Sequence, residues 1–126
     1  MNVFVYGSNE AGINGKGAAL EARKNWGAIQ FCGHGIQGVG IDGGSYAIPT
    51  KDRYIKTLPL NKIKEYVTIF LEYARNHSED TFILTAVGTG LAGYSHFQIA
   101  PMFRGASENV IFPLEWLPFQ EKDNEE

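Results

Sequence analysis

The sequence predicts a single α/β domain built on a mostly parallel sheet. Strands alternate with helices along the 126 residues, and two strands run directly into glycine-rich loops that each precede a helix. A chain of this length corresponds to one domain. We expect that domain to span residues 1–118 and to be followed by an acidic, disordered tail over residues 119–126.

The first half of the chain contains the first strand, loop and helix. Residues 2–6 are β-branched and aromatic, which predicts a strand, and the glycine-rich residues 12–17 predict a loop. Residues 18–26 are rich in helix formers and predict a helix.

Glycines dominate residues 27–44, which predict turns or a loose hairpin with a short strand at residues 29–32. Residues 45–49 predict another strand, ended by Pro49.

The second half repeats the order of strand, glycine loop and helix. Residues 62–76 carry one apolar stripe at helical spacing, with Asn61 as the expected N-cap. Residues 81–87 form a continuous apolar run, typical of a strand buried on both faces. After a second glycine loop, residues 96–103 predict a helix and residues 110–112 a last strand.

The two glycine loops predict an anion site. Each follows a strand, and the carboxyl ends of parallel strands meet at one edge of a sheet, where such folds bind ligands. Glycine-rich turns and helix N-termini present backbone amides to anions, so two facing loops suit a diphosphate. Neither a Walker loop nor a dinucleotide-binding fingerprint is present, because the glycine spacing differs from both.

Composition and charge exclude several classes of protein. The last six residues carry the whole net charge of −3, and the body has no cluster of Lys and Arg, so we expect no nucleic-acid partner. One Cys and three scattered His match no zinc pattern, so we expect no metal. The lone Cys, the absence of a signal peptide and the absence of a long apolar run predict a cytoplasmic protein without a membrane partner.

Three segments together give the sequence a family resemblance. They are Gly7-Ser8-Asn9 with the glycine turn that leads into Ala18-Ala19-Leu20, the lysine-bearing Ile48-Pro49-Thr50-Lys51, and the second loop from Thr85 to Tyr94. The pattern resembles the macro-domain family, and in particular small macro-domain-like proteins of bacteriophages. The resemblance implies a three-layer domain whose mixed sheet is flanked by helices, with an N-terminus shorter than is usual in the family.

The resemblance also implies roles for individual residues. Asn9 would hydrogen-bond the distal ribose of an ADP-ribose-type nucleotide, and Tyr94 would flank that ribose. The two loops would enclose the diphosphate, one with Gly15, Lys16 and Gly17, and the other with Gly88, Thr89, Gly90, Leu91, Ala92 and Gly93. The acidic residue that reads adenine in the family would precede this region, so adenine recognition stays open.

Function divides into three hypotheses at this point. The first is a binding protein for an ADP-ribose-type, NAD-derived nucleotide, which the resemblance suggests could sequester a host immune signal such as a cyclic nucleotide. The second is an ADP-ribosyl hydrolase that acts on ADP-ribosylated protein or nucleic acid and uses Lys51 or a ligand-held water, although the second loop carries Ala92 and no carboxylate to assist that lysine. The third is an interaction module whose glycines only form turns. We expect no cofactor, and the sequence leaves a monomer and a homo-oligomer open.

Overall fold

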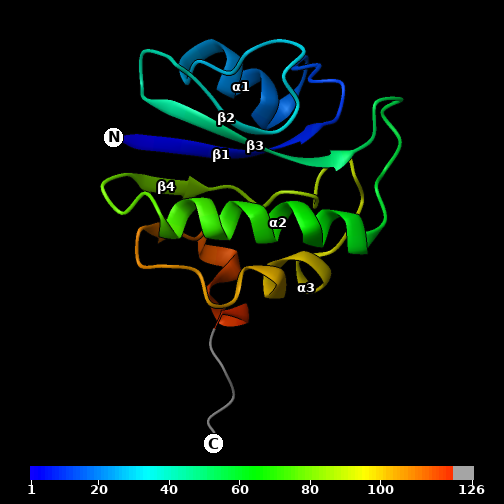
Figure 1. The fold of residues 1–126 in the computed structure, drawn as a ribbon. Coiled ribbons are helices and arrows are strands. Elements are labelled where there is room, and N and C mark those ends of the chain that lie inside the picture. Colours follow the sequence, from blue (N-terminus) through cyan, green and yellow to red (C-terminus); the bar gives the residue numbers. More distant parts are fainter. Residues whose placement is uncertain (121–126) are drawn as a thin grey trace, which may run out of the picture.

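The five strands of the computed structural model form one sheet in the order β2-β3-β1-β4-β5 (Figure 1). The structure describes residues 1–120. Parallel pairs join β1 to β3, β1 to β4 and β4 to β5, and only β2 is antiparallel to its neighbour β3. The α/β fold with a mostly parallel sheet is therefore confirmed. The strands are β1 (Asn2–Asn9), β2 (Gly35–Val39), β3 (Gly44–Lys51), β4 (Thr81–Leu84) and β5 (Val110–Ile111).

Helices cover both faces of the sheet. In Figure 1, α1 (Gly17–Asn25) lies on one face, whereas α2 (Leu60–Arg75) and α3 (His96–Ile99) lie on the other. The central strand β1 serves both layers, because Val3 and Val5 are buried in the larger core beneath α2 and Tyr6 is buried in the smaller core beneath α1. Alternating side chains of a strand point to opposite faces, so β1 is apolar on both.

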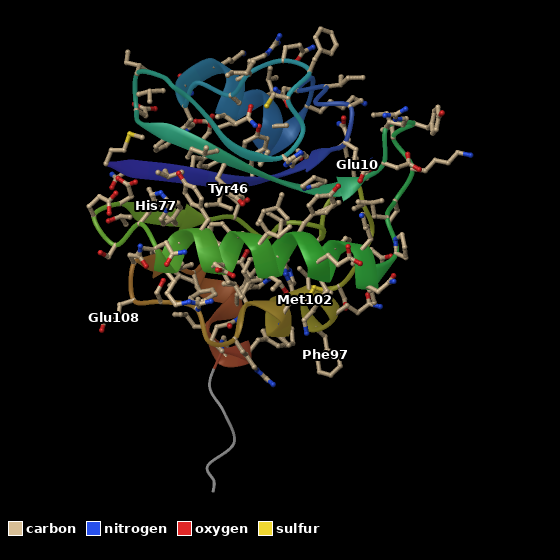
Figure 2. The ribbon with its side chains drawn as sticks, in the orientation of Figure 1. Glu10, Tyr46, His77, Phe97, Met102 and Glu108 are labelled. Atoms are coloured by element: carbon tan, nitrogen blue, oxygen red, sulfur yellow. The ribbon has the colours of Figure 1, made fainter. Side chains whose placement is uncertain are left out.

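The helix α2 forms from the apolar stripe expected of it. Ile63, Val67, Phe70 and Ala74 are buried against the sheet. Tyr46 of β3, labelled in Figure 2, meets the Phe70 ring edge-on, with the ring centroids 5.1 Å apart. The expected N-cap was wrong: Pro59 holds that position with an extended backbone, and Asn61 lies inside the first turn.

Two expectations for the glycine-rich middle of the chain were also wrong. Residues 29–32 form a turn instead of a strand, since Cys32 N–H donates to the Ile29 carbonyl and Phe31 has a φ of 70°. The strand of this region is β2, a few residues later. Pro49 does not end β3: β2 pairs with β3 only as far as Ala47, so one side of β3 needs no ladder donor at the proline.

The chain after β4 closes the larger core. Helix α3 continues into a 3₁₀ turn, η1 (Ala100–Phe103), and a second 3₁₀ segment, η2 (Leu114–Phe119), follows β5. Arg104 Nε donates to the Phe119 carbonyl at 2.7 Å and Gln120 Nε2 to the Ala100 carbonyl at 2.8 Å. Phe119 and Gln120, expected in the tail, are thus held against the domain, and the rest of that tail, residues 121–126, lies outside the described residues. No helix within residues 1–120 is long and apolar enough to cross a membrane.

Candidate functional site

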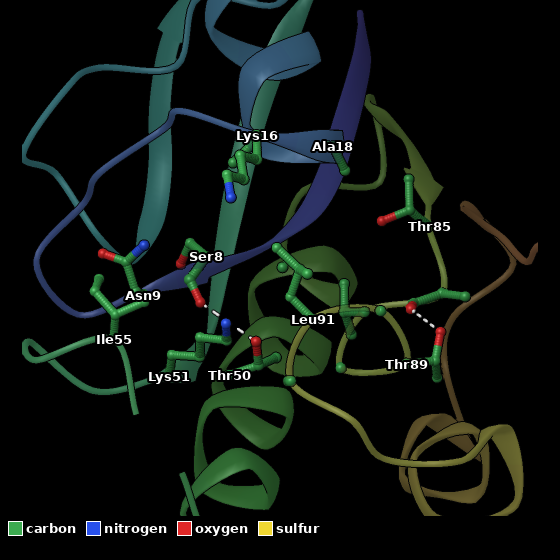
Figure 3. A pocket seen from close by; sticks show the side chains of 18 of the residues that line it. Ser8, Asn9, Lys16, Ala18, Thr50, Lys51, Ile55, Thr85, Thr89 and Leu91 are labelled. Atoms are coloured by element: carbon green, nitrogen blue, oxygen red, sulfur yellow. Dashed lines mark hydrogen bonds between the residues drawn. The ribbon is translucent and has the colours of Figure 1, made fainter. Parts of the chain in front are cut away.

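A cavity of about 720 Å³ opens where β1, β3 and β4 end (Figure 3). Because these strands are parallel neighbours, their carboxyl ends meet there. One wall is the end of β1 with the loop and first turn of α1, a second is the end of β3, and a third is the loop after β4. The lining residues are Gly7, Ser8, Asn9, Ile13, 15–19, Thr50, Lys51, Ile55 and 85–92.

The structure brings most of the expected site residues to this cavity. Those that line it are Asn9, Gly15, Lys16, Gly17, Lys51, Gly88, Thr89, Gly90, Leu91 and Ala92. Gly93 and Tyr94 do not. Tyr94 turns toward the core, where its hydroxyl donates to the Leu58 carbonyl at 2.7 Å. Its position beside a ligand's ribose is therefore not supported by the geometry.

The first loop is shaped by the side chain of Asn9. The Asn9 carboxamide accepts a hydrogen bond from the Ile13 amide and donates one to the Ile13 carbonyl, each at 3.0 Å. One hydrogen of the Asn9 amide group is left for a ligand. These two hydrogen bonds, called the Asn9 bracket below, hold the backbone that leads to Gly15 and to the start of α1.

The start of α1 presents unpaired amides to the cavity. The first N–H groups of a helix have no intrahelical partner. The N-cap residue Lys16 provides no side-chain cap, and the first turn contains no acidic residue. The amides of Gly17 and Ala18, both lining residues, make no hydrogen bond within residues 1–120. Together with the helix dipole, they favour an anion.

The second loop has hydrogen bonds to some of its carbonyls and leaves several of its amides without a partner. Carbonyl oxygens of Ala86, Gly88 and Gly90 accept bonds from the amides of Thr89, Tyr94 and Gly93, at 3.0–3.3 Å. The Ala92 carbonyl accepts from Thr57 Oγ1 at 3.0 Å. The amides of Gly88, Gly90, Leu91 and Ala92 have no partner within the described part of the chain. The carbonyls of Val87, Thr89 and Leu91 likewise accept no bond within the described residues, so this part of the lining contains both unbonded backbone donors and unbonded backbone acceptors.

The charged side chains of the lining are both cationic. They are Lys16 and Lys51, and none of the described lining residues is acidic. In Figure 3 the two ammonium groups extend toward each other, from the α1 loop and from β3. Neither lysine forms a salt bridge with a described residue. The nearby Glu10 instead accepts a hydrogen bond from the Tyr66 hydroxyl at 2.5 Å.

Sequence reasoning missed several lining residues. Ser8, Thr50 and Thr85 lie at or just past the ends of three adjacent strands, a position that the correct strand boundaries would have revealed. Ile55 lines the cavity from the turn after β3 and has a φ of 65°, which is rare for a β-branched residue. No sequence signal marks it.

The arrangement suits an anion with many acceptor oxygens. Backbone amides of the second loop and of the start of α1 line one cavity together with two lysine side chains. Such donors bind phosphates well. Among residues 1–120, no group of three or more His, Cys, Asp or Glu side chains is placed to hold a metal ion.

Comparisons with known proteins support the fold and give no information on function. No protein-family model matches the chain, and no curated protein sequence matches it. A solved structure described as a protein of unknown function from Bacteroides thetaiotaomicron is similar, with a TM-score of 0.60 and 15% identity. The similarity covers 81% of this chain and 77% of that one.

Proposed function

We propose that this protein binds an ADP-ribose-type, NAD-derived nucleotide through its diphosphate. The observation that carries the proposal is the donor pattern of the second loop. The amides of Gly88, Gly90, Leu91 and Ala92 have no partner within the described residues, and all four residues line the cavity. Unbonded backbone amides in a glycine-rich loop are donors that suit a phosphate.

The opposite wall complements that loop. The uncapped start of α1 and the side chain of Lys16 lie across the same cavity. A diphosphate between the two walls would accept hydrogen bonds on both sides. The cavity of about 720 Å³ lies within the range of small-molecule sites, roughly 300–1,000 Å³.

The ADP-ribose class comes from the macro-domain resemblance and agrees with the position of Asn9. In that resemblance an asparagine after the first strand contacts the distal ribose. Here Asn9 lines the cavity and keeps one amide hydrogen free beyond its bonds to Ile13. A ribose hydroxyl oxygen could accept that hydrogen.

Binding without turnover fits the lining better than hydrolysis does. Lys51 lies in the cavity and is the observation that favours the hydrolase alternative. However, none of the described lining residues is a carboxylate that could serve as its acid–base partner. Such assistance is commonly worth about 10²–10⁴ in rate. We therefore propose sequestration of the nucleotide, as in a phage protein that withholds an immune signal from its host.

A capture assay separates these functions. The protein is incubated with ADP-ribose, NAD and cyclic ADP-ribose, filtered out and heated, and the ligands are measured by chromatography with mass detection. We expect a ligand to be depleted from the filtrate and returned unchanged by heating. A product of new mass would show an enzyme instead, and release of ADP-ribose from ADP-ribosylated protein that Lys51→Ala abolishes would establish the hydrolase. Ligands left entirely in the filtrate would contradict nucleotide binding, and no release of ADP-ribose from ADP-ribosylated protein would contradict the hydrolase.

A further inference from the structure

We infer that Ile55 contacts the ligand and that Asp52 holds it at the cavity in a strained backbone conformation. The inference rests on the proposed function and deepens it. It assigns to Ile55 the apolar contact with a sugar or base ring of the nucleotide, and it makes Asp52 the positioning residue for that contact. The observations that carry it are the backbone of the turn after β3, the place of the Ile55 side chain and the hydrogen bonds of Asp52.

Ile55 has a backbone conformation that suits glycine. Its φ is 65°, and a β-branched residue is strained in this left-handed region. Within residues 1–120, eight glycines have a positive φ, whereas Phe31 and Ile55 are the only other residues that do. A glycine would form the turn after β3 with less strain, so the turn itself does not require an isoleucine.

The Ile55 side chain does not offset that strain by packing in a core. Among the described residues, it belongs neither to the two apolar cores nor to the partly buried side chains packed against them. It lines the cavity instead and is 42% exposed (Figure 3). Strained residues persist where the surrounding structure enforces them, and they cluster at ligand sites. Because the side chain is apolar, it suits a sugar or base ring and not a phosphate.

The Asp52 carboxylate fixes the turn that carries Ile55. Its Oδ1 atom accepts hydrogen bonds from the amides of Tyr54 at 2.8 Å and Lys56 at 3.0 Å, the two chain neighbours of Ile55. The Ile55 amide donates to the Asp52 carbonyl at 3.1 Å, and the Asp52 amide donates to the Lys56 carbonyl at 2.7 Å. Asp52 itself does not line the cavity. Its effect on binding would therefore pass through the turn.

Melting temperatures of two Ile55 variants test the strain separately from the contact. Ile55→Ala and Ile55→Gly lose the same side-chain packing, but alanine keeps the left-handed strain and glycine does not. We expect Ile55→Gly to melt at a higher temperature than Ile55→Ala. At an ordinary φ the order is the reverse, because glycine gives the unfolded chain more freedom. A lower melting temperature for Ile55→Gly would overturn the strained conformation.

Asp52→Ala tests the positioning role, because it removes the acceptor of the Tyr54 and Lys56 amides. If Asp52 acts through Ile55, then Asp52→Ala, Ile55→Ala and the double variant should bind ADP-ribose with similar weakened affinities. Asp52→Asn retains an acceptor oxygen and should restore most of the affinity. A double variant weakened by the product of the two single losses would overturn the positioning role of Asp52.

Calorimetric titration of ADP-ribose into Ile55→Ala tests the contact itself. We expect the dissociation constant to rise at least about tenfold, with unchanged salt dependence because the lost contact is apolar. Phe31→Ala is the matched control and should bind like the wild type. Phe31 is the other left-handed residue that is not glycine, is 76% exposed and does not line the cavity.

The outcomes separate the inference from the proposed function. If the wild type binds ADP-ribose and Ile55→Ala binds it equally well, the contact is overturned and the proposed function stands. If the wild type does not bind, both are overturned. A tenfold loss in Ile55→Ala but not in Phe31→Ala would support the contact.

Discussion

The side chain of Asn9 brackets the backbone of Ile13, with two hydrogen bonds of 3.0 Å that run in opposite directions. The residue expected to contact a ligand thus also builds the loop that approaches it. The bracket ties the end of β1 to the segment that precedes α1. Loop shape and ligand contact are therefore linked at one residue.

Replacing Asn9 should affect both stability and binding. Asn9→Ala removes two hydrogen bonds, each worth about 1 kcal/mol, so the free energy of unfolding should fall by about 1–2 kcal/mol. Nucleotide affinity should fall as well, because the loop amides lose their fixed positions. Urea denaturation and calorimetry measure the two effects. Asn25→Ala is the control, since that side chain bonds only to the exposed Glu21 of its own helix. Equal behaviour of the two variants would contradict the role of the bracket.

Two glycines of the second loop should respond differently to alanine. Gly88 has a φ of 80°, and a Cβ there would lie 3.2 Å from Ile99 Cδ1. Gly88→Ala should lower the free energy of unfolding by at least about 1–2 kcal/mol, the usual value for a left-handed residue. At Gly90, by contrast, a Cβ would meet nothing within 4 Å. Gly90→Ala should therefore keep or slightly raise stability. Thermal denaturation of the pair decides the matter, and equal losses would refute this loop geometry.

The two lysines should contribute to affinity through charge. Lys16→Gln and Lys51→Gln should each weaken ADP-ribose binding about tenfold and reduce its dependence on salt, because each removes a cation from the lining. Calorimetric titrations at low and high salt measure both effects. Lys64→Gln is the control: Lys64 is exposed on α2 and does not line the cavity. A site lysine that behaved like Lys64 would have no contact with the ligand's phosphates.

Alkaline pH should destabilise the protein through buried tyrosines. Burial raises the pKa of Tyr46 to about 12, and burial together with the hydrogen bond to Glu10 raises that of Tyr66 to about 12. In the unfolded protein the tyrosine pKa is near 10, so below that pH both states are protonated and the folded state keeps its full stability. As the pH rises from about 10 toward 12, the unfolded state loses its proton first and the free energy of unfolding falls. Phenolate absorbance should show this late titration in the native protein and not in urea.

The Glu10→Gln variant isolates one of these groups. It removes the carboxylate that accepts from the Tyr66 hydroxyl, so the pKa of Tyr66 should fall. Part of the late phenolate signal should then move to lower pH. An unchanged titration curve would show that the contact between Glu10 and Tyr66 does not form in solution.

The sequence predicted the fold where a periodic pattern coincided with a glycine signal. The apolar run at residues 81–87 predicted β4, although the strand ends at Leu84, and the apolar stripe predicted α2. The loops after β1 and β4 had to meet once both strands were parallel neighbours. The sequence-based prediction was wrong where contacts between distant segments determine the local structure. The turn at residues 29–32 is set by contact with the loop after β1, since Phe31 N–H donates to the Gly12 carbonyl. Pro49 is tolerated in β3 because β2 stops short of it.

The candidate site was predictable as two loops but not as a cavity with three walls. The wall from β3 and Ile55 depends on the turn after Lys51, which has no motif. The Tyr94 side chain points toward the core because its hydroxyl donates to the Leu58 carbonyl. These two residues are 36 positions apart in the sequence. Which amides of the second loop stay free is a property of backbone conformation, and residue types do not encode it visibly.

Calorimetric titration of ADP-ribose into the wild type, Gly90→Ala and Gly90→Phe tests the central claim most directly. A side chain at Gly90 would enter open space at the cavity, so Phe should fill the site without disturbing the fold. We expect binding to the wild type and to Gly90→Ala, and loss of binding in Gly90→Phe with an unchanged melting temperature. Equal affinity in all three proteins, or no binding to the wild type, would contradict a nucleotide site between the two glycine loops.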